Sequence, residues 1–147
     1  MFFTADTPIK TDIYENFHHR KEDYYGDTLK SENLNFYHNL FESLLDTNIS
    51  SNVFNNTLKV YNSIPSYISK NIDLNDIYNS NNGTIVMDFE IDFDNVFSIE
   101  IGKNDIGYFS EINAKRAFFC ECVEIENTSL KQLNSDLENF YANFYDA

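Results

Sequence analysis

The stretch that decides the fold reads Thr84-Ile85-Val86-Met87-Asp88-Phe89-Glu90-Ile91-Asp92-Phe93-Asp94. Its odd positions from 85 to 93 are all apolar, and its even positions from 88 to 94 are all acidic. A period of two residues is typical of a β-strand with one buried face and one face in water. The sequence therefore predicts a strand over 84–93 whose wet face carries a row of carboxylates. Such a face suits a positively charged partner and offers little to most catalytic chemistry.

Three further strands are predicted to follow this one at short spacing. They cover residues 96–101, 106–112 and 116–125, separated by turns at 94–95, 102–105 and 113–115. Turns of this length join antiparallel neighbours, so we expect a four-stranded antiparallel meander.

Apolar stripes at three- and four-residue spacing predict helices on both sides of the meander. One stripe follows Ser31, and a second runs from about Ser50 to Ile64, where Pro65 ends it. A third stripe begins near Ser129 and forms a C-terminal helix. The prediction is an α+β fold with N-terminal helices and a C-terminal helix packed on one sheet face.

The domain organisation follows from where periodicity begins. Residues 1–30 show no sustained pattern and are predicted to form an irregular N-terminal arm, whereas 31–147 form a single α+β domain. Residues 67–78 are expected to be a connector between the helices and the first strand. The chain starts without a signal-peptide pattern and has no apolar run near the roughly 20 residues of a membrane span, so we expect a cytoplasmic protein.

The charge of the chain limits its partners. Its 147 residues include 10 basic and 24 acidic side chains, a formal net charge of −14. Residues 84–147 carry four basic and thirteen acidic side chains, a net −9. Because affinity for phosphates comes largely from Lys and Arg, direct binding to nucleic acid is disfavoured, and an anionic membrane repels the chain equally. The charge favours a basic partner protein, although acidity also keeps an aromatic-rich chain in solution.

The carboxylates give one candidate catalytic site. Asp88, Glu90 and Glu100 with Lys103 resemble the acidic core and lysine of restriction-type nucleases, which hold Mg²⁺ beside the scissile phosphate. That motif places its lysine two residues after the acid on one strand. Here Glu100 and Lys103 are three apart and Lys103 falls in a predicted turn, so we expect no metal at these residues.

Other metal and cofactor motifs are also missing from the sequence. His18, His19 and His38 have no partner at ligand spacing, and Cys120 and Cys122 have no second cysteine pair, so both thiols are expected to be reduced. No G-x-S-x-G motif or phosphate-cradling glycine loop is present. We therefore expect no cofactor and no catalytic residue.

The candidate binding site is the predicted acidic sheet face. Its carboxylates come from the first strand and from its neighbours: Asp88, Glu90, Asp92, Asp94, Glu100, Glu111 and Glu121. Like charges at such spacing cost stability, so a basic partner would give the cluster a reason to exist. The alternative is a face that is merely solvated.

Part of the sequence resembles a group of small bacterial accessory proteins encoded near toxin–antitoxin or phage-defence genes. The resemblance covers about residues 50–125 and rests on Ser63-Ile64-Pro65, on Gly83 to Glu90, on Phe97-Ser98-Ile99-Glu100-Ile101-Gly102 and on Ile106-Gly107-Tyr108-Phe109. Phe89 stands where that group usually has a tryptophan. The resemblance implies a non-enzymatic accessory role and no catalytic residues.

Together these features predict a small acidic inhibitor or antitoxin-like protein. Its target would be a basic, nucleic-acid-handling bacterial enzyme, either a toxin nuclease or an RNA-guided CRISPR defence nuclease, blocked by charge mimicry of nucleic acid. Two alternatives stay open: a divalent-metal-dependent nuclease or hydrolase that uses the strand carboxylates, and a structural subunit that forms oligomers.

Overall fold

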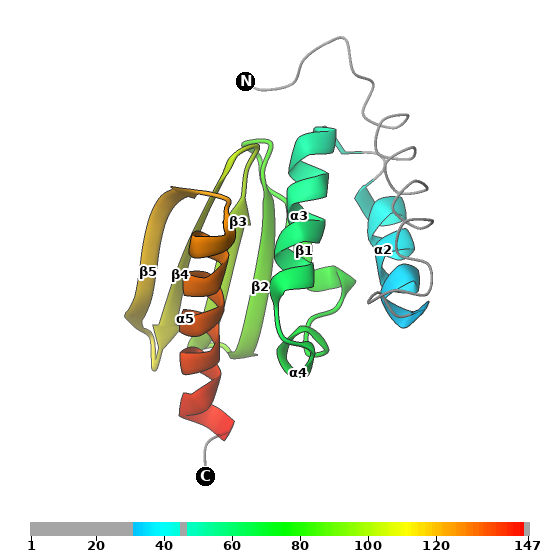
Figure 1. Cartoon of the computed structure of the whole chain (residues 1–147). Coiled ribbons are helices and arrows are strands. Elements are labelled where there is room, and N and C mark those ends of the chain that lie inside the picture. Colours follow the sequence, from blue (N-terminus) through cyan, green and yellow to red (C-terminus); the bar gives the residue numbers. More distant parts are fainter. Residues whose placement is uncertain (1–30, 45–46, 146–147) are drawn as a thin grey trace.

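Figure 1 shows a computed structural model of the chain, which describes residues 31–44 and 47–145. The predicted arm over 1–30 lies outside the described residues. The described chain is an α+β fold in which helices lie at both ends of one antiparallel sheet, so the predicted class is confirmed. None of its helices is long and apolar enough to cross a lipid bilayer.

The sheet has five strands, one more than predicted. They follow the order β1-β2-β3-β4-β5, and every neighbouring pair is antiparallel. Their bounds are β1 (Ile77–Asn79), β2 (Ile85–Asp92), β3 (Asn95–Ile101), β4 (Asp105–Ile112) and β5 (Lys115–Glu124). The predicted meander is therefore present as β2 to β5, and β1 adds a short edge strand beside β2.

The additional strand comes from the segment predicted as a connector. Helix α4 (Ser66–Ser69) and the 3₁₀ turn η1 (Leu74–Asp76) precede β1. Asp73 caps η1, because its Oδ1 accepts from Asn75 N at 2.8 Å while its own N–H donates to Asp76 Oδ2 at 3.1 Å. This cap directs the next residues alongside β2. A strand of three residues is too short for a period of two to reveal in the sequence.

The predicted alternation of the first strand fails at its end. The turn between β2 and β3 is formed by Phe93 and Asp94 rather than by Asp94 and Asn95. The register shifts between Glu90 and Asp92, and Phe93, predicted to face the core, is 91% exposed. A bulge of this kind ends the regular alternation of faces in the strand.

Helix α3 (Ser51–Ser63) and helix α5 (Asn127–Tyr145) cover one face of the sheet (Figure 1). The predicted start near Ser50 and the predicted stop before Pro65 are confirmed for α3, because Ile64 is extended. The structure adds an N-cap, in which Ser50 Oγ accepts from Val53 N at 3.3 Å. Helix α5 begins two residues before the predicted Ser129. The buried face of the sheet meets α5 through aromatic rings, with Phe97 and Phe140 at 5.6 Å between centroids.

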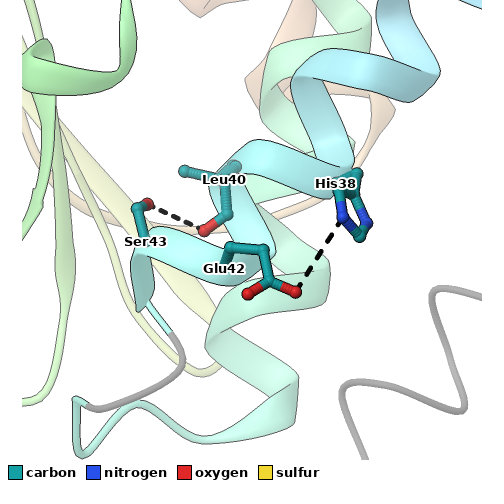
Figure 2. A network of polar contacts seen from close by, with 4 residues as sticks. All are labelled: His38, Leu40, Glu42 and Ser43. Carbon is teal, nitrogen blue, oxygen red and sulfur yellow. Dashed lines mark hydrogen bonds and ion pairs between the residues drawn. The ribbon is translucent and has the colours of Figure 1, made fainter.

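Helix α2 (Ser31–Leu44) packs on α3 rather than on the sheet (Figure 1). Phe41 meets Phe54 edge to face at 6.1 Å between ring centroids. The outward face of α2 carries His38, whose Nε2 lies 3.9 Å from Glu42 Oε2 (Figure 2). Both side chains of this pair are more than half exposed, and exposed pairs contribute little to stability. The apolar contacts therefore hold α2 in place.

Asn95 connects the two turns at one end of the sheet. Its side chain is 6% exposed. Its Nδ2 donates to Asp92 Oδ1 at 2.8 Å, and its Oδ1 accepts from Asn113 N at 2.7 Å. The N–H of Ala114 also donates to the Asp94 carbonyl at 2.9 Å.

We expect Asn95→Ala to lower the free energy of unfolding by about 1–3 kcal/mol, because it removes the hydrogen bonds that the buried Asn95 side chain makes to Asp92 Oδ1 and Asn113 N. Urea unfolding followed by circular dichroism measures this change. Asn81→Ala, at an exposed turn position, is the matched control and should change stability by less than about 0.5 kcal/mol. Equal losses in the two variants would contradict the role assigned to Asn95.

The turn from β4 to β5 holds Ala114 in a left-handed conformation. Asn113 has φ 55° and Ala114 has φ 64°, the pattern of a two-residue hairpin turn that favours Asn-Gly. Ala114→Gly should therefore raise the free energy of unfolding by about 0.5–1 kcal/mol, and Ala114→Val should lower it, because a β-branched side chain tolerates this region poorly. Urea midpoints test the pair, and the opposite order would contradict the turn geometry.

Candidate functional site: the uncovered face of the sheet

The described helices leave one face of the sheet without a cover (Figure 1). We call this the uncovered face. The strand register places its residues in three rows across the sheet, and paired residues in an antiparallel sheet share a face. The rows are Tyr78–Val86–Glu100–Gly107, Asp88–Ser98–Phe109–Phe119 and Glu90–Val96–Glu111–Arg116.

Four of the seven predicted contact carboxylates lie in these rows: Asp88, Glu90, Glu100 and Glu111. None of the four stands directly opposite another carboxylate. Val96, for example, separates Glu90 from Glu111, and Ser98 lies opposite Asp88. The register therefore disperses the charge among neutral side chains, which reduces the repulsion that a continuous lattice would create.

The other three predicted carboxylates lie elsewhere. Asp92 is the last residue of β2 and Asp94 lies in the β2–β3 turn, where Asp92 Oδ1 accepts from Asp94 N at 2.9 Å. This hydrogen bond gives Asp92 a structural role in the turn. Glu121 lies on β5, exposed, and lines a hollow together with Glu100.

Asp88 is the most constrained carboxylate of the uncovered face. Ser98 Oγ donates to its Oδ1 at 2.6 Å, and Tyr78 OH donates to its Oδ2 at 2.8 Å. Burial, followed by this hydrogen bond to Asp88, raises the pKa of Tyr78 to about 12. Sequence reasoning missed Tyr78 as a site residue because β1 was not predicted, although an aromatic residue next to buried Ile77 was a weak signal of a strand.

A hollow of about 730 Å³ lies in the uncovered face over β4. Gly107 contributes no side chain there, and a Cβ at this position would stand 3.1 Å from the carbonyl oxygen of Glu121. The rings of Phe109 and Phe119 line the hollow and are 38% and 51% exposed. Glu100 supplies a carboxylate to the same hollow. The hollow thus combines aromatic surface with negative charge.

Aromatic surface next to carboxylates is chemically suited to a guanidinium or ammonium group. The protein contains one internal example, because Arg116 Cζ lies 4.5 Å from the centroid of the Phe119 ring. The uncovered face can therefore bind cationic side chains by stacking and by charge together.

The residues of the candidate nuclease site do not form one cluster, because each makes its own contacts. Glu100 accepts from Thr84 Oγ1 at 2.5 Å, and Asp88 is bonded to Tyr78 and Ser98. Lys103 falls in the turn between β3 and β4, as predicted. Within residues 31–44 and 47–145, no group of three or more His, Cys, Asp or Glu side chains is placed to hold a metal ion.

Comparisons with protein-family models, with curated proteins and with solved structures found no match to this chain. The function is therefore inferred from the geometry and chemistry of the uncovered face.

The high pKa of Tyr78 gives a direct test of its contact with Asp88. The folded chain favours the neutral phenol, so this group contributes stability below pH 10, and the contribution is lost as the pH rises towards about 12. The difference between the tyrosine ionisation curves of the wild type and Tyr78→Phe isolates this residue. The midpoint of the Tyr78 ionisation should fall near pH 12. In an Asp88→Asn background this midpoint should be lower but stay above 10.0, since burial is the larger cause of the raised pKa. A midpoint at the ordinary tyrosine value would contradict the contact.

Proposed function

We propose that this chain is a non-enzymatic inhibitor, antitoxin-like in its action, that binds a basic region of a nucleic-acid-handling bacterial enzyme through the uncovered face. The target would be a toxin nuclease or an RNA-guided CRISPR defence nuclease. The observation that carries this proposal is the hollow over Gly107, where exposed Phe109 and Phe119 adjoin the carboxylates Glu100 and Glu121.

The aromatic residues support binding more strongly than the charge does. Interface energy is concentrated in a few well-packed aromatic and arginine contacts, whereas exposed rim charges mainly speed association. A solvated acidic face needs no exposed phenylalanine. Phe109 and Phe119 face each other across β4 and β5 and present adjacent apolar surface on the uncovered face.

The proposed contact places an arginine or lysine of the target in the hollow. Such a residue would stack on Phe119 as Arg116 does and would meet Glu100 or Glu121 with its charged end. These are the side chains that nucleic-acid enzymes use to hold phosphates. By occupying these arginine and lysine side chains, the uncovered face would exclude nucleic acid from the enzyme. In this sense the face would mimic nucleic acid.

The test compares two variants with the same change in charge. The face variant is Glu90→Gln/Glu100→Gln/Glu121→Gln, which leaves the Asp88 hydrogen bonds and the Asp92 turn intact. The control variant is Glu42→Gln/Glu126→Gln/Glu138→Gln, at exposed carboxylates of α2, the loop before α5 and α5. Each immobilised protein is used to capture partners from the bacterial lysate at low salt, followed by a salt step.

The wild type and the control should capture a basic nucleic-acid enzyme, and the face variant should bind it roughly tenfold more weakly or worse. Phe119→Ala should weaken binding of the purified enzyme by roughly thirtyfold, the effect of losing about 2 kcal/mol at an interface anchor. The bound enzyme should also release its nucleic acid. Equal capture by the face and control variants, or a target that keeps its nucleic acid, would contradict the proposal.

A further inference from the structure

The outer edge of β5 is the longest open strand edge in the described part of the chain. β5 spans ten residues and ends the sheet, opposite the three-residue β1 (Figure 1). Among the described residues, no backbone group pairs with this outer edge. An open edge of this length is a template for pairing with another strand. β5 contains no proline, but it has two register shifts and four charged side chains, features that restrict pairing to a strand of matching charge.

The charges of β5 differ from those of the other long strands. β2 has three acidic and no basic side chains, β3 has one acidic and none basic, and β4 has two acidic and none basic. β5 has two of each sign, with Lys115 and Arg116 at its start and Glu121 and Glu124 at its second half. A strand that is basic at one end and acidic at the other is complementary to an antiparallel copy of itself.

The register of β5 makes this complementarity geometrically specific. Cys120 pairs with Tyr108 of β4. Arg116 pairs with Glu111, three residues from Tyr108 in one direction, and Glu124 pairs with Asp105, three residues from it in the other. Arg116 and Glu124 are therefore equally far along the strand from Cys120, and both lie on the uncovered face.

We propose that two copies of this chain form a dimer by antiparallel pairing of their β5 edges about a two-fold axis at Cys120. The axis places Arg116 of each copy opposite Glu124 of the other, so the contact contains two symmetric opposite-charge pairs. Cys120 faces its own counterpart. β5 has one register shift between Arg116 and Phe119 and another between Cys120 and Val123, so Arg116 and Glu124 are each separated from Cys120 by one shift.

The dimer joins two five-stranded sheets into one continuous sheet with a single uncovered face on one side. A second copy fits this edge better than a strongly basic strand does, because β5 has no net charge. The inference does not rest on the proposed function: the pairing uses the edge of β5, whereas the proposed contact with a target uses the hollow over Gly107.

The experiment reverses one charge at a time. Arg116→Glu and Glu124→Arg should each weaken dimerisation by roughly tenfold or more, because both symmetric pairs become like-charged. An equimolar mixture of the two variants should form a heterodimer at wild-type strength, since every pair is then of opposite sign. Sedimentation velocity over a concentration series in about 0.15 M salt measures the association, and native mass spectrometry distinguishes the heterodimer from either homodimer.

Lys131→Glu and Glu42→Arg are the matched controls, because they make the same charge changes at exposed positions on α5 and α2, and both should dimerise as the wild type does. Far-ultraviolet circular dichroism confirms that each variant is folded. A wild type that stays monomeric at high-micromolar concentration overturns the proposal. So does a dimer that the single reversals leave unchanged, or variants that fail to restore each other in the mixture.

Discussion

The pairing register of β2 with β3 is the constraint on which the rest of the structure depends. It sets Phe89 opposite Phe97 on the buried face and Asp88 opposite Ser98 on the uncovered face. A slip of one residue would exchange the two faces, placing carboxylates against α5 and phenylalanines in water. Burying a large apolar side chain contributes about 1.5–3 kcal/mol, and a charge buried without a partner costs more than that, so the register has no close competitor.

Polar contacts then fix the helices on the buried face. Tyr108 OH donates to Asp136 Oδ2 at 2.7 Å, joining β4 to α5, and burial with this hydrogen bond raises the pKa of Tyr108. Asn56 Nδ2 of α3 donates to the carbonyls of Gly102 and Lys103 in the β3–β4 turn. Because hydrogen bonds are directional, these contacts select one placement of each helix where apolar packing alone tolerates several. The helices consequently occupy one side of the sheet and leave the other side open.

Sequence periodicity predicted the elements whose patterns are long. The strands from β2 to β5 and the helix ending before Pro65 were predicted because a period of two, or one of three to four, persists over a full element. Prediction from periodicity failed where a single backbone feature interrupted the pattern. The bulge after Glu90 turned Phe93 outward, and the cap at Asp73 created β1 from a segment without alternation. The candidate site was likewise predictable only in part. Its carboxylates were evident in the sequence, whereas Tyr78 and the hollow over Gly107 could not be predicted because they depend on cross-strand neighbours.

The structure also separates the carboxylates into two groups that composition cannot distinguish. Asp88 and Asp92 accept hydrogen bonds within the sheet and its turn, so neutralising them disturbs the fold as well as the charge. Glu90 and Glu121 accept none from the described residues and are exposed, so they are available to an external cation.

An acidic face that served only solubility would not need aromatic rings between its charges. Phe109 and Phe119 occupy those positions, and the unfavourable free energy of exposing their rings to water is offset when a partner covers them. The exposed rings therefore support the proposal that the uncovered face binds a partner.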